Sequence, residues 1–299
     1  MQQWKGCGVT IKERIMYKCM FFQKTIDNVD ALFQYLDEIG NNGDWIFKGL
    51  HSEWNLKNTL ERVLIKAGIK DREGYPKIEK EIIREFQRLY KGKDLYRVRN
   101  DTLYCLSVMQ HHGAPTRLLD FTYSIYIALY FALEYATDNR PVSSANTGLA
   151  IWCINTKWLI DHPTSINIFG LMERYFFDEC RDEESFHRIY MGNQYTFVGL
   201  ENPVQINQRL HLQQGLFLCT GNIKKSFEDN ICEFEGWQKQ SNIQKVICRV
   251  PIGDVQKALE KCRRMNVSRE TLFPGLDGFA QSMKYNLLHY KRQAESRIG

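Results

Sequence analysis

The chain has 299 residues, of which 43% are hydrophobic and 25% are charged, and its formal net charge is +5. No stretch approaches the roughly 18 consecutive apolar residues that a spanning helix needs, so the composition excludes a transmembrane protein and predicts no membrane partner. The mild positive charge favours anionic ligands but falls short of the strongly basic class that is dedicated to nucleic acids.

Nine cysteines are irregularly spaced, and no two of them form a C-x-x-C pair. An odd number without a disulfide pattern predicts a reducing, cytoplasmic compartment. Charged residues from Lys5 to Arg14 interrupt the segment where a signal peptide needs an apolar core, so export through one is not expected. The adjacent His111 and His112 are expected to point apart, and no cluster with metal-ligand spacing stands out, so we predict no metal site.

The first element predicted in the chain is a helix that closes an N-terminal extension, residues 1–40. Its apolar positions recur at helical spacing before a stop at Gly40, and they are Val29, Leu32, Phe33, Leu36 and Ile39. Residues 41–299 are predicted to form a single α+β domain of short mixed strands surrounded by helices. Its core strands are expected near Trp45–Phe47, Arg117–Leu119, Leu149–Ile154, Leu216–Cys219 and Val246–Val250.

Helices are predicted near residues 56–67, 78–89 and 101–110, and the last of them delivers His111 and His112 to its C-terminal end. Positive imidazoles at that end are favoured by the helix dipole. Gly113 and Pro115 then force a turn before a short buried strand that begins at Arg117. The hydroxyl groups of Thr122 and Ser124 can cap a helix over about residues 125–135. Such a strand, turn and helix start presents N–H groups and hydroxyls to an anion or a dinucleotide.

The second half of the chain is less regular. Residues 137–148 are predicted to be a loop, and residues 155–200 carry no clear pattern. A strand follows Arg209 and Gln213, a helix is expected over about residues 254–265, and a turn over 272–279 leads into a final helix.

Five sequence blocks resemble the successive signatures of the FRG domain, a family named for its Phe-Arg-Gly motif. They are FKG at Phe47–Gly49, QHHGAPTRLLDFT from Gln110, ALYFA from Ala128, RLHLQQGLF from Arg209 and LFPGLDG from Leu272, over about residues 41–290. The long QHHGAPTRLLD block is the most specific of them, and Lys48 departs from the arginine of the name motif. The family is met mainly in bacteria and their mobile elements, which implies a role in toxins or phage defence.

The order of these blocks is also similar to that of ADP-ribosyltransferases. Those enzymes carry an arginine or histidine on a first core strand, a Ser or Thr on a second strand followed by a helix with small residues, and a glutamate on a later strand. Lys48, the segment Thr116–Ser124 with Ala128–Ala132, and Gln213 fall in that order, although Gln213 stands where a carboxylate is expected. This resemblance implies NAD as cofactor, with a protein or nucleic-acid acceptor or hydrolysis of NAD.

Breaking the N-glycosidic bond of NAD produces an oxocarbenium-like ribose, so a site must grip the diphosphate and orient the ribose. The resemblance and this chemistry together give a candidate site. Its catalytic candidates are His111, His112, Arg117 and Gln213. Its cofactor-binding candidates are Lys48, Gly49, Thr116, Thr122, Ser124 and Arg209. The residues expected to converge on one cleft are Lys48, His111, His112, Thr116, Arg117, Arg209 and Gln213.

Structural alternatives stay open for several of these residues. Arg117 and Asp120 also fit a buried ion pair or a clamp on loop carbonyls, and Arg209 and Gln213 also fit a role in securing a loop. At the level of function, the missing carboxylate and the lysine at position 48 also fit a non-catalytic sensor that binds a nucleotide or a nucleic-acid end. Release of nicotinamide from NAD separates the enzyme from the sensor.

Overall fold

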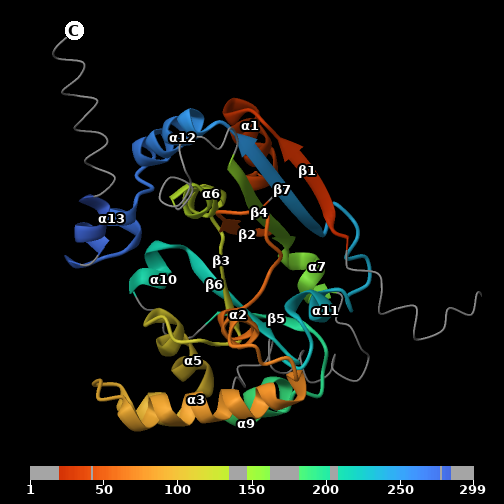
Figure 1. The fold of residues 1–299 in the computed structure, drawn as a ribbon, viewed down its shortest axis with the longest axis vertical. Helices are drawn as coiled ribbons and strands as arrows, with labels where there is room; N and C mark the ends of the chain where they lie inside the picture. Colours follow the sequence, from red (N-terminus) through yellow and green to blue (C-terminus); the bar gives the residue numbers. More distant parts are fainter. Residues whose placement is uncertain are drawn as a thin grey trace, which may run out of the picture.

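A computed structural model describes residues 20–41, 43–134, 147–161, 182–202, 208–276 and 278–283. These residues form one seven-stranded sheet in the order β1-β7-β4-β2-β3-β6-β5, with helices on both faces (Figure 1). The strands are β1 (Phe22–Ile26), β2 (Trp45–Leu50), β3 (Leu118–Thr122), β4 (Thr147–Asn155), β5 (Val198–Glu201), β6 (Gly215–Thr220) and β7 (Ile243–Val250). The prediction of a single α+β domain is confirmed, and all five predicted core strands lie in this sheet.

Neighbouring strands of the sheet run antiparallel except at one edge, where β1 pairs parallel with β7. Segment 1–40 was predicted as an extension, but its strand β1 is part of the common sheet. The side chains of Leu32 and Leu36 in the following helix are fully buried in the core. Residues 22–40 therefore contribute to the same packed unit as the rest of the described chain.

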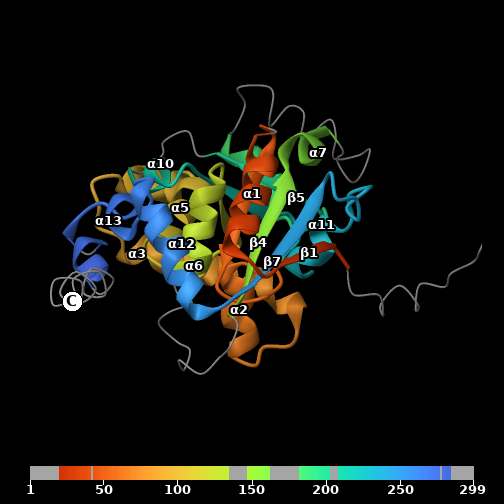
Figure 2. The same ribbon diagram turned by 90° about the horizontal axis from the view of Figure 1, so that it is seen from above.

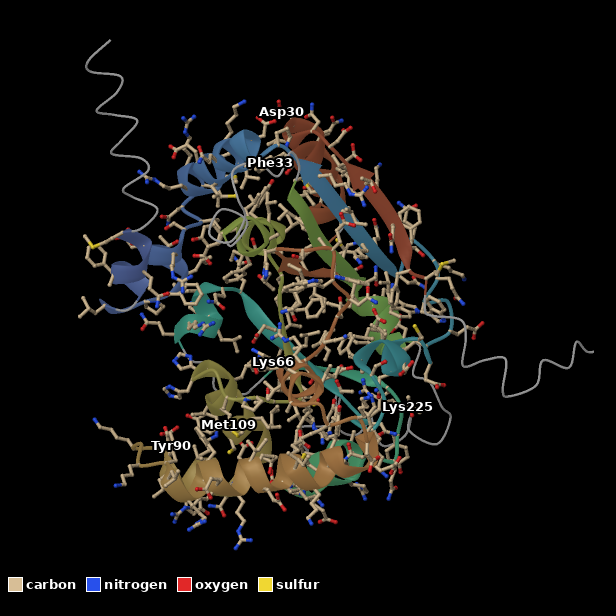
Figure 3. The ribbon with its side chains drawn as sticks, in the orientation of Figure 1. Asp30, Phe33, Lys66, Tyr90, Met109 and Lys225 are labelled. Carbon is tan, nitrogen blue, oxygen red and sulfur yellow. The ribbon has the colours of Figure 1, made fainter. Side chains whose placement is uncertain are left out.

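Helices α1, α6 and α12 pack on one face of the sheet, and α3, α5 and α11 pack on the other. Figure 2 shows the three helices of the first face side by side. Phe33 of α1 lies in the first layer and Met109 of α5 lies in the second (Figure 3). The helices are α1 (Val29–Gly40), α2 (Thr59–Lys66), α3 (Tyr75–Leu89), α4 (Leu95–Asn100), α5 (Thr102–His111), α6 (Ile125–Glu134), α7 (Thr156–Asp161), α9 (Glu183–Phe186), α10 (Gln208–Leu212), α11 (Phe227–Ile231), α12 (Ile252–Arg264) and α13 (Arg269–Leu272). Two short turns of other helical types are η2 (Arg72–Gly74) and η3 (His187–Met191).

Several sequence predictions concern segments that lie outside the described residues. The loop predicted over 137–148 and the final helix predicted after 279 lie mostly outside them. Within them, no helix is both long and apolar enough to cross a membrane. Cys105, Cys153 and Cys219 are buried thiols, whereas Cys232 takes part in a disulfide bond, so the predicted reducing compartment stays a prediction.

Candidate functional site

The middle of β3 carries an acidic side chain in an otherwise buried strand. Asp120 is exposed, whereas the two residues on either side of it in the strand are buried. It stands opposite Phe217 of β6 in the antiparallel ladder, and both residues line a pocket. A central strand of the sheet therefore presents a carboxylate to solvent through this pocket.

The sheet opens between β2 and β3. In the described residues, a single ladder pair, Phe47 with Thr122, joins the two strands, whereas β2 pairs with β4 and β3 with β6 along their whole lengths. The main-chain carbonyl of Asp120 instead accepts a hydrogen bond from Nζ of Lys48 at 2.9 Å. Burial lowers the pKa of Lys48, an effect that Asp120 opposes and Arg62 reinforces. Lys48 thus holds the edge of β3 at the point where the ladder to β2 ends.

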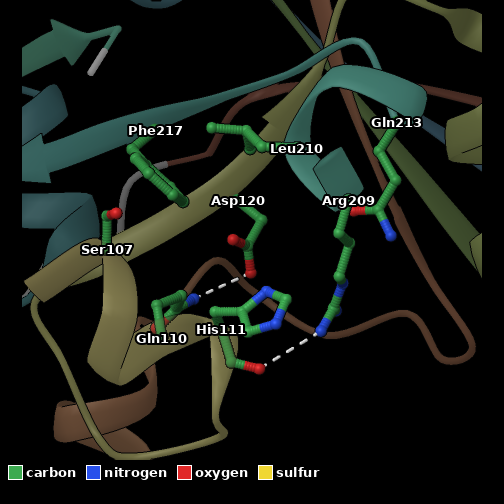
Figure 4. Close-up of a pocket in the computed structure, with 8 residues that line it drawn as sticks. All are labelled: Ser107, Gln110, His111, Asp120, Arg209, Leu210, Gln213 and Phe217. Carbon is green, nitrogen blue, oxygen red and sulfur yellow. Dashed lines mark hydrogen bonds between the residues drawn. The ribbon is translucent and has the colours of Figure 1, made fainter. Parts of the chain in front are cut away.

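The pocket beside Asp120 is built from four elements of the chain (Figure 4). Its lining residues are Ser107, Gln110 and His111 of α5, Asp120 of β3, Arg209, Leu210 and Gln213 at α10, and Phe217 of β6. The pocket is open on one side, and its volume is about 20 Å³, which is room for one water molecule. Most of the lining side chains are polar and two, Leu210 and Phe217, are apolar, so the site suits a single small polar molecule at its floor and a larger ligand only at its open side.

A chain of two hydrogen bonds orients the carboxylate of Asp120. Oγ1 of Thr116, which is fully buried, donates to Oε1 of Gln110 at 2.6 Å. Nε2 of Gln110 then donates to Oδ2 of Asp120 at 2.8 Å. Because the hydroxyl donor occupies the amide oxygen, the amide NH₂ group is the end that faces Asp120.

The two histidines contact each other, and the prediction that they point apart was wrong. The ring centroids of His111 and His112 are 5.0 Å apart and the rings are nearly perpendicular. The reason is that α5 ends at His111, and His112 has already left helical geometry as the C-cap. Figure 4 shows the His111 ring between Asp120 and Arg209, and Nη1 of Arg209 donates to the His111 carbonyl at 3.4 Å.

The environment of His111 disfavours its positive form. Burial lowers the pKa of His111, and the charges of Arg209 and His112 lower it further. These effects oppose the helix dipole, which favours a cation at this end of α5. The imidazole of His111 is therefore the neutral form near pH 7, able to accept a proton.

Replacing His111 with glutamine is expected to make the free energy of unfolding less sensitive to acid. The folded state binds the imidazole proton less tightly than the unfolded chain, in which the pKa of the histidine is about 6.5. The wild type should therefore lose stability as the pH falls from 6.5 through the lowered pKa of His111 in the folded state. The variant should lose less stability over the same range. Urea denaturation on both sides of pH 6.5 measures the difference, with His211→Gln on the exposed side of α10 as control. Equal pH slopes in wild type and His111→Gln would contradict the assignment.

Arg117 does not lie in the pocket, and its assignment to a catalytic cleft is corrected by the structure. Its side chain is fully buried and pairs with the buried carboxylate of Glu79 through Nε and Nη2. Nη1 also donates to the main-chain carbonyls of Tyr190 and Thr220, at 2.6 and 3.1 Å. The pair with Glu79 raises the pKa of Arg117 even though burial opposes its charge. Arg117 thus links α3, η3 and β6 to the start of β3.

The predicted partner of Arg117, Asp120, is engaged elsewhere. Its side chain accepts from Gln110 and lies in the pocket. The alternative in which Arg117 and Asp120 form an ion pair is therefore wrong as well. The part of that alternative in which Arg117 binds main-chain carbonyls is confirmed.

The hydroxyl groups at the start of α6 make hydrogen bonds within the protein. Oγ1 of Thr122 donates to the Gln213 carbonyl at 2.7 Å and accepts from the N–H of Ser124 at 3.0 Å. Oγ of Ser124 accepts from the N–H of Ile127 at 3.4 Å, within the first turn of α6. Nε2 of Gln213 donates to the Leu272 carbonyl at 3.1 Å, which joins α10 to α13.

The seven residues that were expected to converge differ in how close they come to the pocket. Those that line it are His111, Arg209 and Gln213. Those bound to a lining residue are Lys48, through the Asp120 carbonyl, and Thr116, through Gln110. His112 contacts the ring of His111, and Arg117 lies elsewhere. The predicted chemical roles of the first six stay predictions.

Sequence reasoning missed Asp120 as a residue of the site, although a signal for it was present. The segment LLDFT places one carboxylate in the middle of an apolar strand, and buried acids without partners are costly. Such a residue is expected at an opening in the fold. Glu79 was missed too, because α3 carries several carboxylates and none of them is marked by its spacing.

Comparison with known proteins agrees with the sequence blocks found above. Residues 43–140, about a third of the chain, match the family model described as the FRG domain. This range contains β2, β3, α5 and α6, and therefore Lys48, the two histidines and Asp120. The chain matches no curated protein and no solved structure.

Proposed function

We propose, from the premise that the chain contains an FRG domain, that the protein is an NAD-consuming enzyme of the ADP-ribosyltransferase type. It would break the bond between nicotinamide and ribose and pass ADP-ribose to a macromolecule or to water. Such consumption of NAD would fit a toxin or phage-defence role by analogy.

The observation that carries this proposal is the adjacency of three strands. The resemblance requires a cation on one strand, a hydroxyl on a second and a glutamate on a third, where this chain has Gln213, and it says nothing about the order of the strands in the sheet. Here β2, β3 and β6 are direct neighbours, and Phe47, Thr122 and Gly215 form one row across them. Lys48 follows Phe47 on β2 and lies toward Asp120, whereas Gln213 precedes Gly215 and lies beyond the end of β3, so the three sequence motifs lie close to one row of three neighbouring strands.

A second feature that supports the proposal is the close approach of α6 to β2. A Cβ at Gly49 would overlap the Ala128 carbonyl oxygen and lie 2.8 Å from the Ala132 nitrogen. The glycine of the FKG block and the small residues of the ALYFA block are therefore explained by one contact. This contact holds the strand that carries Lys48 against the helix that follows β3.

The charges near the pocket suit a diphosphate. Lys48 lies at the opening between β2 and β3, and Arg209 lines the pocket. Charge-assisted hydrogen bonds to phosphate are among the stronger ones in proteins, and a lysine supplies a point charge where an arginine supplies a fork. The carboxylate of Asp120 and the neutral imidazole of His111 lie beside these cations, so the site also holds groups that can accept a proton.

The test of this proposal is release of nicotinamide from NAD by the purified protein, together with calorimetric titration of NAD. Lys48→Ala is expected to weaken NAD binding by about 1.5–3 kcal/mol, which is about 10- to 150-fold in Kd. Lys48→Arg should keep or improve affinity because the fork of an arginine fits phosphate better.

Lys225→Ala serves as the matched control, because Lys225 is an exposed lysine on a different part of the surface (Figure 3). It should leave the affinity for NAD unchanged. Unchanged NAD affinity in Lys48→Ala, or no NAD binding by the wild type, would remove the dinucleotide from the proposal.

A second candidate function is a sensor that binds a nucleotide or a nucleic-acid end without turnover. It is favoured by the engagement of Thr122, Ser124 and Gln213 in hydrogen bonds within the protein. Their polar groups would have to exchange partners before they could hold a ribose. Binding of NAD or of a terminal phosphate without nicotinamide release would identify this function.

A further inference from the structure

Asp120 has a position that folding alone does not require. It is the exposed residue of a central strand whose other members are buried, it stands opposite Phe217 in the ladder to β6, and its main-chain carbonyl is bound by Lys48. In the described part of the chain Oδ2 accepts from Gln110, and Oδ1 makes no hydrogen bond. One carboxylate oxygen is thus fixed by the protein and the other is available to a ligand.

The surroundings of Asp120 hold it in a defined orientation. Thr116 fixes the amide of Gln110, and that amide donates to the carboxylate. On the backbone side, Lys48 binds the carbonyl of the same residue at 2.9 Å. Groups that are preorganised in this way keep a catalytic carboxylate in place with little reorganisation during a reaction.

The floor of the pocket is sized for one water molecule. This space of about 20 Å³ is lined by Ser107, Gln110, His111 and Asp120 among others, and the pocket is open on one side. These groups provide the two to four polar partners that a bound water needs. A water molecule fits in this space beside the carboxylate, whereas the side chain of a protein acceptor would have to enter from the open side of the pocket.

We infer that Asp120 is the catalytic carboxylate of this site and that water is the acceptor, which makes the protein an NAD glycohydrolase. This inference rests on the proposed NAD chemistry and assigns to Asp120 the acidic role that Gln213 cannot fill. The water oxygen forms a bond to C1′ of the ribose while the bond from C1′ to the nicotinamide nitrogen breaks. The electron pair of that bond stays on nicotinamide, which leaves uncharged. Oδ1 of Asp120 takes the water proton and returns it to solvent, and the products are ADP-ribose, nicotinamide and one proton.

The decisive variant is Asp120→Asn, which keeps the size of the side chain and an acceptor for Gln110. Nicotinamide release is expected to fall by about 100-fold or more, since general-base catalysis contributes roughly 10²- to 10⁴-fold. NAD affinity by calorimetry and the melting temperature should stay near those of the wild type. Asp30→Asn, on the outer surface of α1 (Figure 3), is the matched control and should keep full activity.

The form in which the wild type releases ADP-ribose from NAD shows whether the acceptor is water or a macromolecule. Free ADP-ribose equal in amount to nicotinamide supports water, whereas ADP-ribose attached to protein or nucleic acid in a lysate overturns this part of the inference. A wild type that releases nicotinamide together with an equally active Asp120→Asn overturns the assignment of Asp120 and leaves the proposed function intact. A wild type that releases no nicotinamide overturns both.

Discussion

Replacing Arg117 with alanine is expected to lower the free energy of unfolding by about 3–5 kcal/mol, since removing one partner of a buried ion pair leaves the other charge uncompensated. The charge left behind is that of Glu79, which is 2% exposed. The carbonyls of Tyr190 and Thr220 would lose their donor at the same time. Urea denaturation followed by circular dichroism measures the loss, and nicotinamide release should fall only in proportion to unfolding.

Two controls make this expectation specific to the buried pair. Arg249→Ala removes an arginine whose side chain is 51% exposed and whose partner Glu53 is also near the surface, so it should cost less than about 1 kcal/mol. The double variant Arg117→Met with Glu79→Leu removes both buried charges and should recover much of the lost stability. If Arg117→Ala is as stable as Arg249→Ala and instead loses affinity for NAD, Arg117 belongs to the ligand site and its structural role is refuted.

The ion pair shows where sequence reasoning could have gone further. Successive side chains of an extended strand point to opposite faces, so residues three apart also point to opposite faces. The side chains of Arg117 and Asp120 therefore point to opposite faces of the sheet, which excludes the ion pair that their spacing suggested. The true partner, Glu79, is 38 residues away. Local spacing carries no information about a partner that the tertiary fold supplies.

The elements found from the sequence were those with strong apolar periodicity. The helix at 29–40 buries Leu32, Phe33, Leu36 and Ile39, which are the positions that predicted it. The strand β1 was missed because three of its five side chains are exposed at the sheet edge, so its composition resembles a loop. The strand β5 is a four-residue edge strand at the other side of the sheet, too short for a periodic signal.

The site was located by its densest block of polar residues, but its chemistry depends on contacts between distant segments. The block from Gln110 to Asp120 does contain the carboxylate, the amide that orients it and the lining histidine. Which of these residues face the pocket is decided by the end of α5 and by the register of β3 with β6. Neither is visible without the sheet order, so the sequence favoured Arg117 and passed over Asp120.

Replacing Gly49 with alanine is expected to lower the free energy of unfolding by about 3 kcal/mol, at the upper end of the usual cost of overpacking. The new Cβ would overlap the Ala128 carbonyl oxygen and lie 2.8 Å from the Ala132 nitrogen. Both are main-chain atoms of α6, so no side-chain rotation can relieve the overlap and the helix must move away from β2. The displacement should also weaken NAD binding, because Lys48 is the neighbour of Gly49 on the same strand.

The matched control is Gly253→Ala in α12, where a Cβ would meet no atom within 4 Å. Alanine in a helix should leave stability unchanged or raise it by about 0.5–1 kcal/mol. Thermal and urea denaturation of both variants, with NAD titration of each, compares the two glycines directly. If Gly49→Ala is as stable as Gly253→Ala, α6 does not pack against the backbone of β2. The glycine of the FKG block would then need a different explanation, such as close approach of a ligand to β2. A Gly49→Ala variant that keeps its stability but loses affinity for NAD would support that explanation.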